Sequence, residues 1–389
     1  MHILEIPSFF TPYGGEFCLE QAKALQQRGH DVRILANVQL AVRNGLRHFF
    51  LQYPYGRRWE SCDGVEVYRS YQRGIPLAVR MNHSRWVGAV RSMFQEYVSR
   101  YGKPDIIHAH CVKWAGYAAM LIGRDFGLPF VITEHLPKEI YQVEFGAPPA
   151  DKWQIPLLRQ ALHEAKTVIT VSDELVDDLS CYFGRDYRHT TVNNIIDVDF
   201  FAYRERQPLV GRPFRFCCPA LFVERKGYDI LFRSFAIVAR EHPEVELHVA
   251  GMNTASRECR SLAKAAGCDK KVVFHGTLSK TGVREMLWNS DAMVLATRGE
   301  SQGLVLLEAM STGIPAISTE AIPVSVRPDC GLHYVPVGNA EALAREMLSA
   351  MEKPSDGRHL WHEQVIRMAS PDAIAEKIEK VFKNALDSQ

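Results

Sequence analysis

The chain has 389 residues, of which 47% are apolar and 23% charged, the proportions of a folded globular protein. This length favours two domains, each with its own core, and excludes a small scaffold held together by disulfides. There are 46 Lys and Arg against 45 Asp and Glu, a formal charge of +1. So small a net charge argues against a protein coated in positive charge, and we expect no nucleic-acid partner.

Nine cysteines are scattered along the chain without a CxxC pair. This pattern favours reduced thiols in an intracellular protein. The first residues, MHILEIPSFF, lack the basic segment and long apolar stretch of a secretory signal. No run of eighteen apolar residues occurs, which argues against a membrane span. We therefore expect a cytoplasmic protein, and leave open a peripheral contact with the inner face of the cell membrane.

Short apolar runs alternate with amphipathic stretches in the first half of the chain. The run at 2–6 precedes a turn-rich segment and a helical pattern over 17–25. Further strands are expected at 28–36, 105–110, 129–135 and 167–172, with helical patterns between most of them. This alternation predicts a parallel sheet with helices on both faces.

A second alternating series follows residues 204–213, a charged stretch with two prolines and no periodicity, which we interpret as an interdomain linker. Strands are expected at 214–220, 245–251, 271–276, 292–297 and 314–318. A single amphipathic helix is expected from residue 371 onward. The chain is thus predicted to be α/β, with doubly wound domains at 1–203 and 214–370 and a final helix at 371–389.

Residues 40–100 differ from the rest, because ten arginines stand against four acidic residues, a net charge of +6. Aromatic residues are interleaved with these charges. A cationic, aromatic loop region of this kind can dock an anionic substrate or the headgroup layer of a membrane. The alternative is a solvated surface insertion whose aromatic side chains are buried. Candidate acceptor contacts in this region are Arg57, Arg58 and Trp59.

Two strand ends of the first domain carry candidate binding groups, since ligands bind beyond the carboxyl ends of strands in doubly wound sheets. Gly14 and Gly15 follow the first strand and precede a helix, so their amides can approach an anion. Their spacing is not the GxGxxG of a nicotinamide binder.

Histidines mark the ends of two further strands. His108 and His110 lie on one face of a strand, and Glu134 and His135 end the next. His, His and carboxylate are zinc-type ligands, but the spacing matches no zinc signature. We favour a role in binding hydroxyls or phosphate, and expect no metal.

The second domain carries its candidates in two strand-to-helix loops. Arg225, Lys226 and Gly227 suit a diphosphate, because two cations neutralise the anion and glycine lets the backbone come close. In the sequence RGESQGLVLLEAMSTGIPAIS, Glu300 precedes a predicted helix and Glu308 lies near its second turn. The helix N-terminus would face phosphate, and a carboxylate in so apolar a run points to use in binding.

These motifs resemble the GT-B nucleotide-sugar glycosyltransferases of glycosyltransferase family 4, the retaining group 1 transferases, over nearly the whole chain. The matching features are GGE, HAH, TEH, ITVSDEL, NNIID, ERKG, VVFHG and the E-x7-E spacing of Glu300 and Glu308. The resemblance implies two Rossmann-like domains facing each other across a cleft. It also implies that the last helix packs back on the first domain.

The resemblance implies a role for each candidate of the second domain. Arg225 and Lys226 would clamp the donor diphosphate, Glu308 would bind the ribose diol and Glu300 would face the transferred sugar. The backbone amides of Gly303, Leu304 and Val305 would hold phosphate or sugar. No metal or other cofactor is expected, since the cations and helix ends would take its place.

In the first domain, the resemblance implies that Gly14 and Gly15 approach the diphosphate and that His110 lies beside the reacting sugar. Glu16 and His135 join the three acceptor candidates named above.

The expected activity is retaining transfer of a hexosyl or N-acetylhexosaminyl group from a nucleoside diphosphate sugar, by default a UDP-sugar, to a hydroxyl. The acceptor, lipid-linked or anionic, would belong to cell-envelope polysaccharide or glycolipid synthesis. The alternatives are a sugar-nucleotide epimerase or hydrolase of the same fold, a non-catalytic nucleotide-sugar-binding protein and a zinc hydrolase. No residue indicates the oligomeric state.

Overall fold

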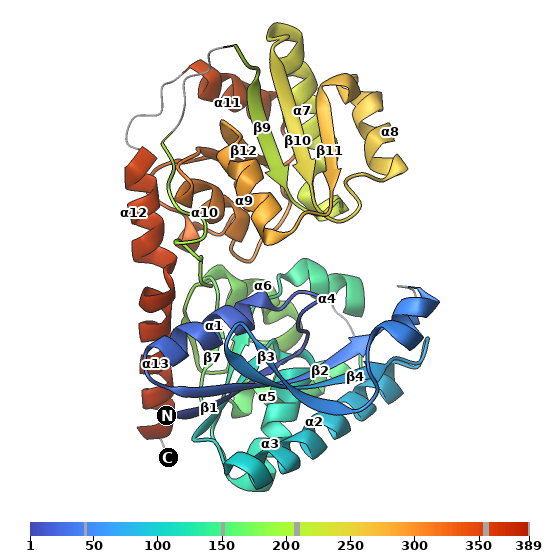
Figure 1. The fold of residues 1–389 in the computed structure, drawn as a ribbon, viewed down its shortest axis with the longest axis vertical. Helices are drawn as coiled ribbons and strands as arrows, with labels where there is room; N and C mark the ends of the chain where they lie inside the picture. Colours follow the sequence, from blue (N-terminus) through green and yellow to red (C-terminus); the bar gives the residue numbers. More distant parts are fainter. Residues whose placement is uncertain (43–44, 149–151, 206–210, 353–357, 388–389) are drawn as a thin grey trace. The chain divides into compact units, whose positions relative to one another are not determined.

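The computed structural model describes residues 1–42, 45–148, 152–205, 211–352 and 358–387. It divides into two compact units (Figure 1): unit 1 comprises Met1–Ile195 with Pro371–Gln389, and unit 2 comprises Ile196–Ser370. Each unit is built on one largely parallel sheet with helices, so the predicted pair of doubly wound α/β domains is confirmed. Within the described ranges, no helix is long and apolar enough to cross a membrane.

The sheet of unit 1 has eight strands in the order β3-β4-β2-β1-β5-β6-β7-β8. Among the strands that the structure describes in this sheet, only β3 and β4 pair in antiparallel fashion. The strands are β1 His2–Pro7, β2 Asp31–Leu40, β3 Arg57–Cys62, β4 Val65–Arg73, β5 Ile106–His110, β6 Phe130–Glu134, β7 Val168–Thr170 and β8 His189–Thr191. From β1 the chain builds first toward β2 and later toward β5, so the strand order reverses between β1 and β5.

Helices cover both faces of this sheet because successive strand residues point to opposite sides. Ile3 packs in a core with residues of α1 and α13, whereas Leu4 packs in a core with residues of α2 and α3. The helices are α1 Glu16–Gln27, α2 Val79–Tyr101, α3 Tyr117–Phe126, α4 Lys138–Phe145, α5 Gln154–Glu164, α6 Glu174–Phe183 and α13 Pro371–Asp387, with short turns η2 His48–Gln52 and η3 Val112–Gly116.

Unit 2 has a six-stranded parallel sheet in the order β11-β10-β9-β12-β13-β14. The strands are β9 Phe214–Pro219, β10 Val245–Ala250, β11 Val272–Gly276, β12 Ala292–Leu295, β13 Ala316–Thr319 and β14 Leu332–Val335. The helices are α7 Tyr228–Glu241, α8 Arg257–Ala266, α9 Lys280–Trp288, α10 Leu304–Ser311, α11 Ala340–Glu352 and α12 Arg358–Ala369, with short turns η4 Glu224–Lys226, η5 Asp269–Lys271 and η6 Val324–Val326. Here the strand order reverses between β9 and β12.

The first boundary between the units lies earlier than the predicted position at residue 203. Ile196, Val198 and Phe201 are buried in the core of unit 2, and the Ile196 amide donates to the Ala369 carbonyl at 2.7 Å. These apolar residues therefore belong to unit 2. Residues 206–210 of the predicted linker lie outside the described residues.

Residues 40–100 are only in part the loop region that we expected. Residues 57–73 form the β3–β4 hairpin, and the long helix α2 begins at Val79. Trp86 is 1% exposed, and Trp59 stacks on Tyr68 with ring centroids 4.5 Å apart. Part of the aromatic content is therefore core, while Phe50 and Tyr55 remain exposed.

Candidate functional site

The point of unit 2 where the strand order reverses brings two loops together. The loop 220–227 follows β9 and the loop 296–303 follows the adjacent strand β12. The Arg225 carbonyl accepts from the Arg298 amide at 2.7 Å and from the Thr297 hydroxyl at 3.1 Å. The Arg298 guanidinium donates to the Glu224 carbonyl at 2.7 Å. Ligands bind at such points in doubly wound sheets, and here the two loops are fixed to each other.

Gly227 makes this close approach possible. Its backbone is left-handed, with φ of 64°. A Cβ atom at this position would lie 1.9 Å from the Ala296 carbonyl oxygen. Only glycine therefore allows the first loop to pass over the end of β12.

Three charged side chains gather on these loops. Lys226 Nζ lies 2.5 Å from Glu300 Oε1, and Arg225 Nη1 lies 3.4 Å from Glu300 Oε2. The Arg225 guanidinium also donates to the Gly299 carbonyl at 2.5 Å. Two cations thus share one carboxylate, which leaves a net positive charge of one unit at a largely buried position. An anionic ligand is favoured at a place with this charge.

The helix α10 begins on the second of these loops. Gly303 is its N-cap, with φ of 81° and no side-chain cap, so the first amides of the helix present positive charge without a side-chain acceptor. Leu304 and Val305, in the first turn, are partly buried. Glu308 follows on the same helix, and burial raises the pKa of its carboxyl to about 7.

A second cluster lies in unit 1, where the strand order reverses between β1 and β5. Glu5 Oε2 is 2.8 Å from His108 Nδ1 and 2.7 Å from His110 Nε2. His110 Nδ1 in turn lies 3.1 Å from His135 Nε2, and the His135 ring stacks on Phe17 with centroids 3.7 Å apart. The four polar side chains are buried.

The charge state of this cluster fixes its hydrogen bonds. Burial opposes a charge on Glu5, but the neighbouring His108 and His110 lower the pKa of this carboxyl to about 2. Burial lowers the pKa of His110 to about 4 and that of His135 well below its usual value. At neutral pH His110 therefore donates from Nε2 to the Glu5 carboxylate and accepts at Nδ1 from His135. Both ring nitrogens of His110 are occupied within unit 1.

The carboxylate that joins the histidines is Glu5. The zinc alternative required Glu134 at this place. Glu134 accepts hydrogen bonds from the amides of Val112, His135 and Leu136 and from the Tyr141 hydroxyl at 2.8 Å. Ligand atoms of Glu5, Cys18 and His110 do lie within 4.8 Å of one another. The 2.7 Å between Glu5 and His110 is, however, shorter than the roughly 3.3 Å between two ligands of a tetrahedral zinc ion. The cluster therefore fits hydrogen bonding better than zinc.

Gly15 is the member of the glycine pair at which a side chain would clash with the backbone. It is the N-cap of α1 with φ of 84°, and a Cβ atom there would lie 2.3 Å from the Phe9 carbonyl oxygen. Gly14 also has a left-handed backbone, with φ of 89°, but a Cβ atom there would meet only side chains at ordinary contact distance, the Phe9 ring at 3.6 Å and Glu16 Oε2 at 3.9 Å. Glu16, the first residue of α1, is exposed.

The predicted acceptor residues do not form one group. Arg57 contacts Glu96 on α2, Arg58 pairs with Glu60 at 3.0 Å, and Trp59 is partly buried and packs against the core. All three lie on β3 at the edge of the sheet, three strand positions from β1, a distance of roughly 14 Å. They are therefore separated from the cluster around His135.

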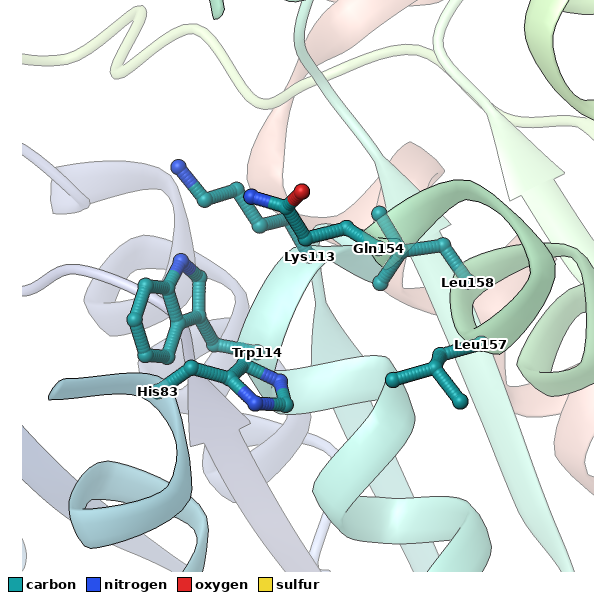
Figure 2. Close-up of a pocket in the computed structure, with 6 residues that line it drawn as sticks. All are labelled: His83, Lys113, Trp114, Gln154, Leu157 and Leu158. Atoms are coloured by element: carbon teal, nitrogen blue, oxygen red, sulfur yellow. The ribbon is translucent and has the colours of Figure 1, made fainter. Parts of the chain in front are cut away.

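A small cavity in unit 1 is a poor candidate for a sugar site. Figure 2 shows its lining residues, which are His83, Lys113, Trp114, Gln154, Leu157 and Leu158. Its volume of about 10 Å³ holds about one water molecule. Burial and the charge of Lys113 lower the pKa of His83 to about 4, so this ring is neutral.

Comparison with known families accounts for both units. Residues 199–368 match the glycosyl transferases group 1, and residues 14–194 match the glycosyl transferase 4-like domain. The chain belongs to the family of group 1, glycosyltransferase 4-like proteins. The resemblance stated from the motifs is thereby confirmed.

Relatives of this chain include a putative teichuronic acid biosynthesis glycosyltransferase, TuaC, of Bacillus subtilis. It is 25% identical over 97% of this chain and 94% of its own length. The D-inositol 3-phosphate glycosyltransferase of Arthrobacter is 25% identical over 56% of this chain and 55% of its own. With a glycogen synthase of Mycobacterium tuberculosis the match covers 53% of that protein. The match to these last two relatives thus spans about half of their length.

Solved structures show that the fold is GT-B-like. Sucrose-phosphate synthase from Thermosynechococcus elongatus superposes with a TM-score of 0.80 at 18% identity, covering 100% of both chains. Anabaena HepE in complex with UDP gives a TM-score of 0.70 at 16% identity, covering 98% of this chain and 100% of the other.

The sequence motifs did not point to three residues of the cluster in unit 1. Glu5 looked like one polar residue in a buried strand, Phe17 like an ordinary helix residue, and Thr133, which lies 2.6 Å from His108 Nε2, like a strand residue. A carboxylate in the middle of the first strand was the available signal, because a buried charge needs a partner.

Proposed function

We propose that this protein is a retaining glycosyltransferase that uses a nucleoside diphosphate sugar, by preference a UDP-sugar, and a hydroxyl acceptor of polysaccharide or glycolipid synthesis. The observation that carries the proposal is the charged group of Arg225, Lys226 and Glu300 beside the N-terminus of α10. The UDP complex of HepE and the relationship to TuaC agree with it.

The chemistry asked of unit 2 is the departure of a nucleoside diphosphate from an anomeric carbon. Negative charge develops on the leaving oxygen, and fixed cations and helix amides stabilise such charge without reorganisation. In our proposal Arg225 and Lys226 face the diphosphate, and the amides of Gly303, Leu304 and Val305 face phosphate or sugar. The acceptor attacks from the face that the diphosphate leaves, and a phosphate oxygen takes its proton. Glu300 then positions the cations and the sugar and forms no covalent bond.

Unit 1 is proposed to handle the acceptor. We propose that His110 acts in the reaction through His135. Its own ring nitrogens already bond to Glu5 and to His135, which supports this indirect role. Glu5 holds His110 in one tautomer, so that His135 is held in one orientation as well.

Nucleotide affinity should depend on pH through Glu308. A carboxylate accepts hydrogen bonds from both ribose hydroxyls, whereas a carboxylic acid loses one acceptor. Because the pKa of Glu308 is about 7, we expect UDP to bind more tightly at pH 8 than at pH 6. Glu308→Gln should bind UDP about tenfold more weakly at pH 8.

Calorimetric titration of UDP at both pH values measures this effect. The side chain of Glu308→Gln is uncharged at both pH values. Any change of UDP affinity with pH in this variant therefore comes from the nucleotide or from other side chains. A rise in affinity that persists unchanged in Glu308→Gln would remove Glu308 from the ribose site.

A further inference from the structure

Large apolar side chains are exposed in two segments of unit 1: the loop that follows β2, and the loop that follows β4 together with the first turn of α2. We call this surface the apolar rim. Its members are Leu46, Phe50, Leu51, Tyr55, Ile75, Leu77, Val79 and Met81. Leu51 is 79% exposed and Leu77 is 100% exposed. These eight are almost half of the eighteen exposed large apolar residues of the described chain. Apolar exposure concentrated in this way marks a surface that meets a partner.

Residues 49–55 of the first loop are fixed to the end of β4, where the second segment begins. The guanidinium of Arg73, at the end of β4, donates to the carbonyls of Phe49 at 3.1 Å, Pro54 at 3.0 Å and Tyr53 at 2.5 Å. The same guanidinium lies 3.7 Å from the centre of the Tyr55 ring. Arg73 thus holds the first loop against the start of the second.

The second loop is closed by Asn82. This side chain accepts from the Ile75 amide at 2.8 Å and donates to the Ile75 carbonyl at 2.7 Å. Between them Leu77 has a left-handed backbone, with φ of 62°, which costs free energy for a residue with a Cβ atom. An unfavourable backbone that displays a fully exposed leucine indicates that its exposure is used.

The charge around the apolar rim is positive. The sequence contains no Asp or Glu from 32 to 59 or from 67 to 95. Arg47, Arg80 and Arg85 are exposed. Arg80 lies over the Trp153 ring at 5.6 Å, and Arg85 donates to the Arg73 carbonyl at 3.1 Å. Within the described residues none of these three arginines pairs with a carboxylate.

We propose that the apolar rim docks unit 1 on the surface of a bilayer that contains anionic lipids. Apolar side chains enter the boundary between headgroups and acyl chains, and the arginines meet lipid phosphates. A second copy of the chain fits less well, because a two-fold contact would place the same arginines opposite one another. Docking of this kind does not depend on the proposed donor, so it is tested apart from the transferase activity.

Flotation of the full chain with vesicles tests the proposal. We expect binding to vesicles of phosphatidylcholine with about a third phosphatidylglycerol, and little binding to phosphatidylcholine alone. The double variant Leu51→Ser/Leu77→Ser should bind the anionic vesicles at least about tenfold more weakly, since two leucines no longer enter the bilayer. Arg47→Gln/Arg80→Gln should reduce binding about tenfold or more in low salt and less in high salt.

The matched control is Val143→Ser, which removes an apolar side chain of unit 1 that is 89% exposed outside the apolar rim. It should bind vesicles like the unaltered chain. Thermal unfolding checks that every variant is folded.

Absence of binding to anionic vesicles, equal binding to neutral ones, or an equal loss in Val143→Ser would overturn the proposal. Sedimentation velocity adds a further outcome. If the chain self-associates and the leucine variant becomes monomeric without a change in vesicle binding, the partner is a second copy and the lipid proposal is wrong.

Discussion

Replacing Lys226 with Ala is expected to lower kcat by about 100-fold or more, measured as release of the nucleoside diphosphate from the sugar donor. The loss of one preorganised group that stabilises developing negative charge has an effect of this size. Lys226 lies 2.5 Å from Glu300, so its removal also leaves that carboxylate with only Arg225 at 3.4 Å. The remaining cation would then be held more firmly by Glu300 and be less available to the diphosphate.

Two further variants separate charge from structure. Lys226→Arg keeps the cation and should recover part of the turnover, although the larger group cannot adopt the same contact. Lys270→Ala removes an exposed lysine of unit 2 and should leave kcat unchanged. If Lys226→Ala turned over the donor at the unaltered rate while remaining folded, Lys226 would have no part in the reaction.

Replacing Gly227 with Ala should destabilise unit 2 by about 4 kcal/mol and abolish tight nucleotide binding. The new Cβ atom would lie 1.9 Å from the Ala296 carbonyl oxygen, so the loop carrying Arg225 and Lys226 must move off the end of β12. That movement breaks the hydrogen bond from the Arg298 amide to the Arg225 carbonyl.

Gly267→Ala is the matched control for this variant. Gly267 also has a left-handed backbone, with φ of 79°, but a Cβ atom there has no neighbour within 4 Å. Gly267→Ala should lower the free energy of unfolding by only about 1 kcal/mol, because a residue with a Cβ atom disfavours a left-handed backbone. Nucleotide affinity should be unchanged. Denaturant unfolding and calorimetry measure both quantities. Equal losses in the two variants would mean that the contact with Ala296 does not constrain the loop.

The parallel strands were predictable because their apolar runs are short and each is followed by a helical pattern. The β3–β4 hairpin was missed, although its turn was visible. Asp63 and Gly64 both have positive φ, 48° and 87°, and join paired strands whose last facing residues are Cys62 and Val65. A two-residue Asp-Gly turn is a strong hairpin signal. We expected a loop because this segment carries many charges. It forms a strand because β3 lies at the edge of the sheet, where charged side chains are tolerated, unlike in a central strand.

The residues of the candidate site of unit 2 could be predicted, because they follow two strands that lie side by side where the strand order reverses. That Glu300 contacts both cations depends on side-chain directions, which the sequence does not specify. Glu5 and His110 are 105 positions apart. Their hydrogen bond follows only from the register of β1 against β5, in which Glu5 faces His108 and Pro7 faces His110. Such a register depends on tertiary packing that no local pattern encodes.

We propose that the loops after β9 and β12 bind the diphosphate of a nucleotide sugar. Calorimetric titration of UDP, GDP and ADP into the intact chain and into the double variant Arg225→Ala/Lys226→Ala measures this binding. We predict saturable binding of at least one of the three, UDP by preference, and a loss of affinity of about 100-fold in the double variant. Absence of binding by all three nucleotides, or undiminished affinity in the folded double variant, would contradict it.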